Sequence, residues 1–134
     1  MRVAVFAARQ VPKHVIYSAL DQLHGEHGLT VIAWIENNGG AAACDWATSR
    51  PGASVVSVSS VKGPGSRFMG TSFDSKAALI CILKVHAPDR TLIFASPYWV
   101  ASGVGRNILQ QAERWMVPAY LYAPVHAGSI TEGR

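Results

Sequence analysis

Two glycine-containing segments each lead into a run of helix-forming residues, and each carries residues that can bind an anion. Gly39 and Gly40 precede an alanine-rich run that contains Asp45, and the segment 102–106 reads Ser-Gly-Val-Gly-Arg. Glycine permits positive φ and a close backbone approach, so several N–H groups at a helix N-terminus can converge on one phosphate. The alternative for the first segment is an ordinary turn capped by Asn38, because glycine pairs are common in turns.

In the second segment, Gly103 and Gly105 again suit a backbone cradle, and Ser102 precedes them. Arg106 falls in the first turn of the following helix, where the helix dipole disfavours a cation unless an anion is bound nearby. Solvent screening would also remove much of that penalty, so a solvent-facing Arg106 is the competing interpretation. Asp45 lies about one and a half turns into its helix, where it can accept a hydroxyl of the ligand or face solvent.

Four further residues complete the candidate ligand-binding set. A long loop carries Lys62 and Arg67, which could clamp a phosphate, although a solvated basic loop is an equal alternative. Arg9 directly follows the first hydrophobic run. Trp99 lies in a loop rich in small and polar residues, where its ring could stack on a base.

These residues must be positioned by short apolar runs that alternate with helical periodicity. The runs lack the polar alternation of half-exposed strands, which indicates strands buried on both faces, at 3–8, 29–35, 53–60, 90–96 and 118–123. Helices are predicted at 14–24, 41–50, 73–87 and 105–116. The alternation predicts an α/β fold, a Rossmann-like three-layer sandwich whose parallel sheet of about five strands carries helices on both faces. Ligands of such folds bind at the carboxyl ends of the strands, where the loops described above lie.

The chain has 134 residues, of which 49% are hydrophobic and 15% charged, and this composition is typical of a compact globule. We expect a single domain over 1–123 and a loose C-terminal tail at 124–134. The net charge of +4 comes from 12 Lys and Arg against 8 Asp and Glu, and the cations are scattered along the chain. A small anionic ligand fits this pattern better than nucleic acid, which would need clustered basic residues.

Cys44 and Cys81 have no ligand-like spacing to each other or to a histidine, so they are interpreted as buried thiols in a reducing compartment. The apolar run that follows Arg2 is too short for a signal peptide or a membrane span. A cytoplasmic protein without a membrane partner, metal or cofactor is therefore expected.

From residue 2 to 123, the order of these segments resembles the SLOG superfamily, in the branch related to the circularly permuted YpsA type. Relatives of that branch include the LOG phosphoribohydrolases. Gly39, Gly40 and Asp45 match its G-G-A-R-G-A-D pattern, but alanine replaces the arginine at 42 and the third glycine at 43. In the later P-G-G-x-G-T pattern only the glycine spacing is kept, and Arg106 occupies the place of the threonine. The glutamate that LOG enzymes carry just beyond it is absent from 107–110.

The resemblance implies a protein that binds a nucleotide or a nucleotide-derived signalling molecule, as a sensor or a sequestering protein. Cleavage of an N-glycosidic bond needs a positioned carboxylate, and the matching position has none. The first alternative is a phosphoribohydrolase that has moved its acid to Asp45, Glu36 or Asp74. The second is an interaction module without a small ligand, whose tryptophans form a homo-oligomer interface.

Overall fold

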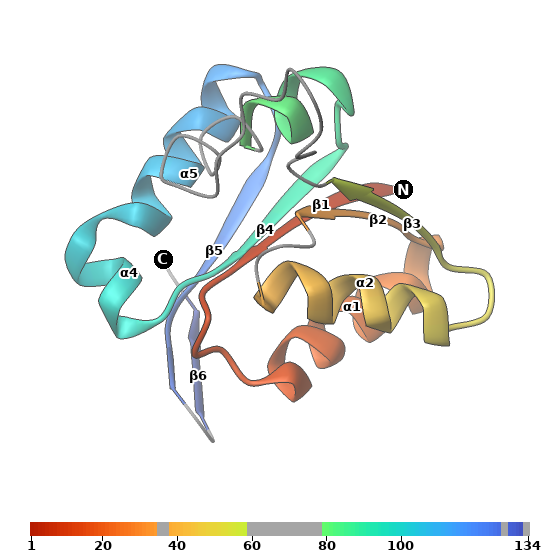
Figure 1. The fold of residues 1–134 in the computed structure, drawn as a ribbon, viewed down its shortest axis with the longest axis horizontal. Helices are drawn as coiled ribbons and strands as arrows, with labels where there is room; N and C mark the ends of the chain where they lie inside the picture. Colours follow the sequence, from red (N-terminus) through yellow and green to blue (C-terminus); the bar gives the residue numbers. More distant parts are fainter. Residues whose placement is uncertain (35–37, 59–78, 127–128, 133–134) are drawn as a thin grey trace, which may run out of the picture.

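The computed structural model describes residues 1–34, 38–58, 79–126 and 129–132. Its centre is a six-stranded sheet in the order β3-β2-β1-β4-β5-β6 (Figure 1). The first five strands in chain order are parallel, which confirms the predicted parallel sheet of about five strands. The strands are β1 (Arg2–Ala7), β2 (Thr30–Trp34), β3 (Ser54–Val58), β4 (Arg90–Phe94), β5 (Ala119–His126) and β6 (Ser129–Glu132).

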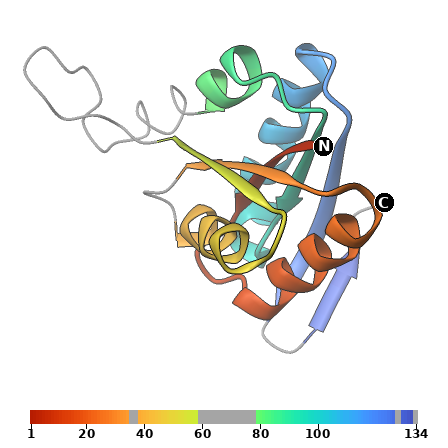
Figure 2. The ribbon, with the colours of Figure 1, turned by 90° about the vertical axis from the view of Figure 1, so that its right-hand side faces the viewer.

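Helices cover both faces of the sheet, as the sequence predicts. They are α1 (Lys13–His27), α2 (Asn38–Ser49), the π-helix η1 (Cys81–Val85), α4 (Pro97–Ser102) and α5 (Val104–Arg114). In Figure 2, the orange α1 and the yellow-orange α2 lie on one side of the strands, and the green η1 and the blue α5 lie on the other. None of the helices in the described ranges combines the length and the apolar character that crossing a membrane requires.

Successive side chains of the central strands point to opposite faces of the sheet and pack against the helices on each face. On β1, Val3 and Val5 belong to the hydrophobic cluster that includes α1 and α2, whereas Ala4 packs with Ile82 of η1 on the other face. On β4, Ile93 packs against α5. Because both faces are covered, consecutive residues of each strand are buried, and this explains the absence of polar alternation in the sequence.

The pair α1 and α2 is joined by a polar contact as well as by apolar packing. Trp46 of α2 is fully buried, and its indole Nε1 donates a hydrogen bond of 2.8 Å to Asp21 Oδ1 of α1. Arg50, just after α2, donates to both carboxylate oxygens of Asp21, at 2.7 and 3.1 Å. The carboxylate of Asp21 therefore accepts the hydrogen bond of the buried indole and also forms an ion pair with Arg50.

The C-terminal segment differs from the expectation of a loose tail. β5 continues to His126, and β6 pairs with it in antiparallel orientation. This pairing hydrogen-bonds backbone groups of β5 that an edge strand would leave to solvent. A four-residue strand is too short to show a periodic pattern, which is why the sequence did not reveal it.

The predicted helix at 73–87 falls partly outside the described residues. The chain is helical from residue 79 and continues into η1, where His86 N donates to Cys81 O. Residues 73–78 of this prediction, and the last two residues of the strand predicted at 53–60, lie outside the described ranges.

Candidate functional site

The strand order reverses between β1 and β4, which makes this pair the topological switch point of the sheet. β2 and β3 extend the sheet on one side of it, and β5 extends it on the other. Ligands of open α/β sheets bind at such a point, outside the carboxyl ends of the strands. The two strand ends are joined there, because Ala8 N donates to Phe94 O at 2.9 Å. We refer to the loops and helix starts around this point as the carboxyl edge.

Gly39 and Gly40 hold the N-terminus of α2 against the ends of two strands. A Cβ on Gly39 would collide with the Cβ of Ala7 and would lie 2.6 Å from the Ala7 carbonyl oxygen. A Cβ on Gly40 would collide with the carbonyl oxygen of Trp34, the last residue of β2. Only glycine permits this approach, and it fixes the positive end of the α2 dipole at the carboxyl edge.

Gly39 and Gly40 do not use the positive φ that glycine permits. α2 begins at Asn38, so Gly39 and Gly40 lie in its first turn, and neither belongs to the glycines with positive φ. Their missing side chains serve the close packing of helix on strand rather than a left-handed turn. Asn38 is likewise the first residue of the helix, which starts earlier than the predicted residue 41.

Further along α2, the side chains are divided between the core and solvent. Ala42 and Ala43 are buried, so the positions where the SLOG pattern has arginine and glycine are core positions in this chain. Asp45 is exposed, in agreement with the solvent-facing alternative. Burial, followed by the charge of Asp45, raises the pKa of the half-buried Cys44 thiol, so this thiol stays protonated at neutral pH and is a poor nucleophile.

After β4 the chain forms a short helix, α4, where the sequence was interpreted as a loop. The Ser96 hydroxyl accepts a hydrogen bond from Trp99 N at 3.2 Å, and Pro97 occupies the first turn. Serine followed by proline is a helix-start signal that could have revealed this helix. Trp99 is half-buried and packs against the hydrophobic layers on both faces of the sheet. The indole is therefore partly used in core packing, and it is less available to stack on a base than the loop interpretation suggested.

Gly103 and Gly105 have different structural roles at the junction of α4 and α5. Gly103 ends α4 and precedes α5 with φ of 79°, a left-handed conformation that glycine adopts without strain. Gly105 is buried, and a Cβ there would lie 3.2 Å from Ala95 Cβ and 3.4 Å from Leu121 Cδ1. It therefore lets the start of α5 pack closely on the ends of β4 and β5. Ser102, the last residue of α4, is exposed.

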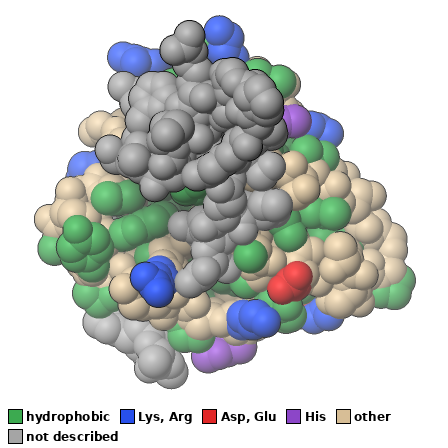
Figure 3. Space-filling view, viewed as in Figure 1, with side chains coloured by type: hydrophobic (Ala, Val, Ile, Leu, Met, Phe, Trp, Pro, Cys, Tyr) green, Lys and Arg blue, Asp and Glu red, His purple; other side chains and the backbone are tan. Residues whose placement is uncertain are grey.

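Two cations of the predicted set lie at the carboxyl edge. Arg9 follows the end of β1, and Arg106 lies in the first turn of α5. Both side chains are exposed, and among the described residues neither forms an ion pair. In the view of Figure 3, the Lys and Arg side chains that are visible lie apart from one another rather than in a continuous track, in keeping with the scattered cations of the sequence.

Four predicted residues cannot be placed with the others. The candidate phosphate ligands Lys62 and Arg67 lie outside the described residues, as do the alternative acids Glu36 and Asp74. The structure therefore places Arg9, the first turn of α2 and the start of α5 at the same edge of the sheet, whereas Asp45 lies further along α2, beyond its first turn.

The described parts of the carboxyl-edge loops carry cations and hydrogen-bond donors but no carboxylate. Segments 8–12, 38–41 and 95–106 contain arginine, serine and backbone N–H donors but neither Asp nor Glu. Within the described ranges, no cluster of His, Cys, Asp and Glu side chains could hold a metal ion.

Comparisons with known proteins leave the family open. The chain matches no protein-family model, no curated protein and no solved structure. Membership of the SLOG superfamily stays a prediction that depends on the motif residues quoted above.

Proposed function

We propose that the carboxyl edge binds a small phosphate-bearing ligand of the nucleotide type, as a sensor or a sequestering protein would. The observation that carries the proposal is the presence of two exposed arginines at the carboxyl edge, Arg9 and Arg106, with no ion-pair partner in the described part of the chain. An unpaired cation at this edge of an open α/β sheet suits a bound anion.

The helix start that carries Arg106 adds a physical reason. A cation in the first turn of α5 opposes the positive end of the helix dipole, at a cost of about 0.3–1 kcal/mol when exposed. A phosphate group bound nearby would be attracted by the Arg106 cation and by the positive end of the α5 dipole. Ligand binding would therefore make the position of Arg106 favourable. The first turn of α2, held at the same edge by Gly39, supplies a second helix N-terminus.

Binding without turnover is the form of the function that these residues support. The described edge segments have no carboxylate, and Asp45 lies beyond the first turn of α2. A phosphoribohydrolase would need a carboxylate near the glycosidic bond, so this alternative depends on residues outside the described ranges.

The test is thermal unfolding of the purified chain with nucleoside monophosphates, cyclic nucleotides, ADP-ribose and NAD. A ligand present at one hundred times its Kd should add about 2.7 kcal/mol of stability, which is a shift of several degrees. Arg9→Ala and Arg106→Ala should each reduce this shift. Arg114→Ala removes an exposed arginine from the opposite end of α5 and should leave it unchanged. No shift for any member of the panel would contradict the proposal.

A further inference from the structure

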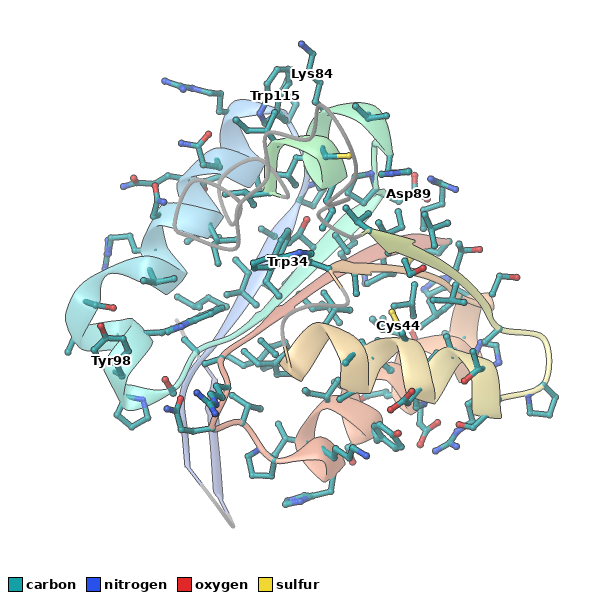
Figure 4. All side chains as sticks on the ribbon, in the orientation of Figure 1. Trp34, Cys44, Lys84, Asp89, Tyr98 and Trp115 are labelled. Carbon is teal, nitrogen blue, oxygen red and sulfur yellow. The ribbon has the colours of Figure 1, made fainter. Side chains whose placement is uncertain are left out.

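The end of the molecule opposite the carboxyl edge exposes large apolar side chains. Met116 is 89% exposed and Trp115 39% exposed at the end of α5, while Val85 is 69% and Ile80 37% exposed in and before η1. Figure 4 shows Lys84 and Trp115 side by side, and the Lys84 Nζ lies 5.7 Å from the centre of the Trp115 ring. We call Ile80, Val85, Trp115 and Met116 the α5–η1 patch.

The backbone at the end of α5 shows that Met116 occupies a position suited to glycine. Val117 N donates to Ala112 O and Met116 N donates to Glu113 O, both at 2.9 Å, which is the hydrogen-bond pattern of a Schellman motif. The residue at the turn of this motif is left-handed, and Met116 has φ of 60°. A non-glycine residue is strained there. The chain thus holds a long apolar side chain in solvent at a position where glycine would be more stable.

We propose that the α5–η1 patch is the surface through which two copies of this chain associate about a two-fold axis. Tryptophan and methionine are enriched at the centres of protein interfaces, and a two-fold contact sets the same patch against itself. Burial of Met116 and Val85 against a second copy would offset the strain at the turn. This inference is independent of ligand binding at the carboxyl edge.

The charges around the patch favour a second copy as the occupant. Lys84, Arg114 and Glu113 are all exposed beside it, so both signs are present. A two-fold contact can pair Glu113 of one copy with Lys84 or Arg114 of the other. A purely anionic surface, such as a lipid headgroup layer, would attract Lys84 and Arg114 but repel Glu113, whereas a second copy can pair charges of both signs.

The first experiment measures the mass of the full chain by light scattering at concentrations from about 1 to about 500 μM, a range in which weak dimers dissociate. We expect a dimer that dissociates on dilution. Met116→Gly should weaken it by at least about tenfold, since it removes the most exposed apolar side chain of the patch. The same substitution should raise the melting temperature of the monomer, because glycine relieves the left-handed strain, so a folding defect would be recognised.

The matched control is Tyr98→Ser on α4, which removes another highly exposed side chain. Tyr98 is 69% exposed, against 89% for Met116, and lies at the other end of the molecule (Figure 4). It should leave the association unchanged. A monomer at every concentration, or a dimer that Met116→Gly does not weaken, would overturn the proposal.

Reversing the charge of Glu113 distinguishes a second copy of the chain from a lipid membrane as the occupant of the α5–η1 patch. Glu113→Lys should weaken the dimer because it makes the rim uniformly positive. If the patch instead bound lipid, the wild-type chain would stay monomeric, sediment with phosphatidylserine vesicles and bind them more tightly with Glu113→Lys. That result would overturn the proposal in favour of a membrane surface.

Discussion

Thr91 places a hydroxyl group in the core of the sheet without a hydrogen-bond partner among the described residues. The side chain is fully buried, and Oγ1 has no donor or acceptor in reach there. Thr91 lies two residues before Ile93, which packs against α5, so alternation along β4 places both side chains on that face. A buried polar group without a partner loses its hydration and gains nothing in return.

Thr91→Val should therefore stabilise the protein by about 1 kcal/mol, because a methyl group replaces the unpaired hydroxyl at similar volume. The expected result is a rise of a few degrees in the melting temperature measured by circular dichroism. Thr91→Ser is the matched control, since it keeps the hydroxyl, loses the methyl and should lower the melting temperature. A destabilised Thr91→Val protein would show that the hydroxyl has a partner, such as an internal water molecule.

At the scale of elements, the position of α2 depends on two residues that have no side chain. The distance from a Cβ on Gly39 to the carbonyl oxygen of Ala7 would be 2.6 Å, which is too short for real atoms. A larger residue must push the start of α2 away from the end of β1. Trp46, which lies further along the same helix and is fully buried, would then lose part of its packing.

Gly39→Ala should destabilise the fold by about 1–3 kcal/mol, as other overpacking substitutions do. Gly25→Ala provides the control, because Gly25 lies within α1 and a Cβ there would meet nothing within 4 Å. Alanine is the better helix former, so this variant should gain about 0.5–1 kcal/mol. Urea unfolding of both variants measures the difference, and equal effects of the same sign would contradict the packing role of Gly39.

At the scale of the whole molecule, the sequence was sufficient to locate the five parallel strands, and ligand binding at their carboxyl edge stays a prediction. Buried strands appear as unbroken apolar runs, and the fold class then selects their carboxyl ends. The roles of individual edge residues could not be predicted, because they depend on contacts between distant parts of the chain. Gly39 packs against Ala7, and Trp99 packs against two hydrophobic clusters. Neither contact produces a recognisable pattern in the neighbouring sequence.

The same reason explains the errors at α2 and in the C-terminal segment. A glycine pair indicates a turn if only local conformational freedom is considered, whereas Gly39 and Gly40 are helical because of what lies beside them. β6 is defined by its pairing with β5 and not by its own four residues.

The ion pair between α1 and α2 makes the stability of the whole molecule depend on pH. Hydrogen bonds from Arg50, and then from Trp46, hold the pKa of Asp21 below its usual value of 3.8. A lowered carboxyl pKa means that the ionised form stabilises the fold. This contribution is complete above the unfolded-state pKa and is lost as the pH falls through the lower folded-state value.

Asp21→Asn should therefore lower the melting temperature at pH 7, and the difference from the wild type should shrink as the pH falls below about 3.8. The Asp21 side chain is 47% exposed, so solvent screening limits the effect to less than about 1 kcal/mol. Asparagine can still accept the hydrogen bond from Trp46 at Oδ1, but its amide nitrogen cannot accept the one that Arg50 Nη2 donates to Oδ2, so the substitution removes the charge together with that hydrogen bond. Asp45→Asn, an exposed position without an ion pair in the described part of the chain, is the control and should show a smaller difference at pH 7. A difference for Asp21→Asn that stays constant or grows on acidification would show that the carboxylate charge does not hold α1 and α2 together.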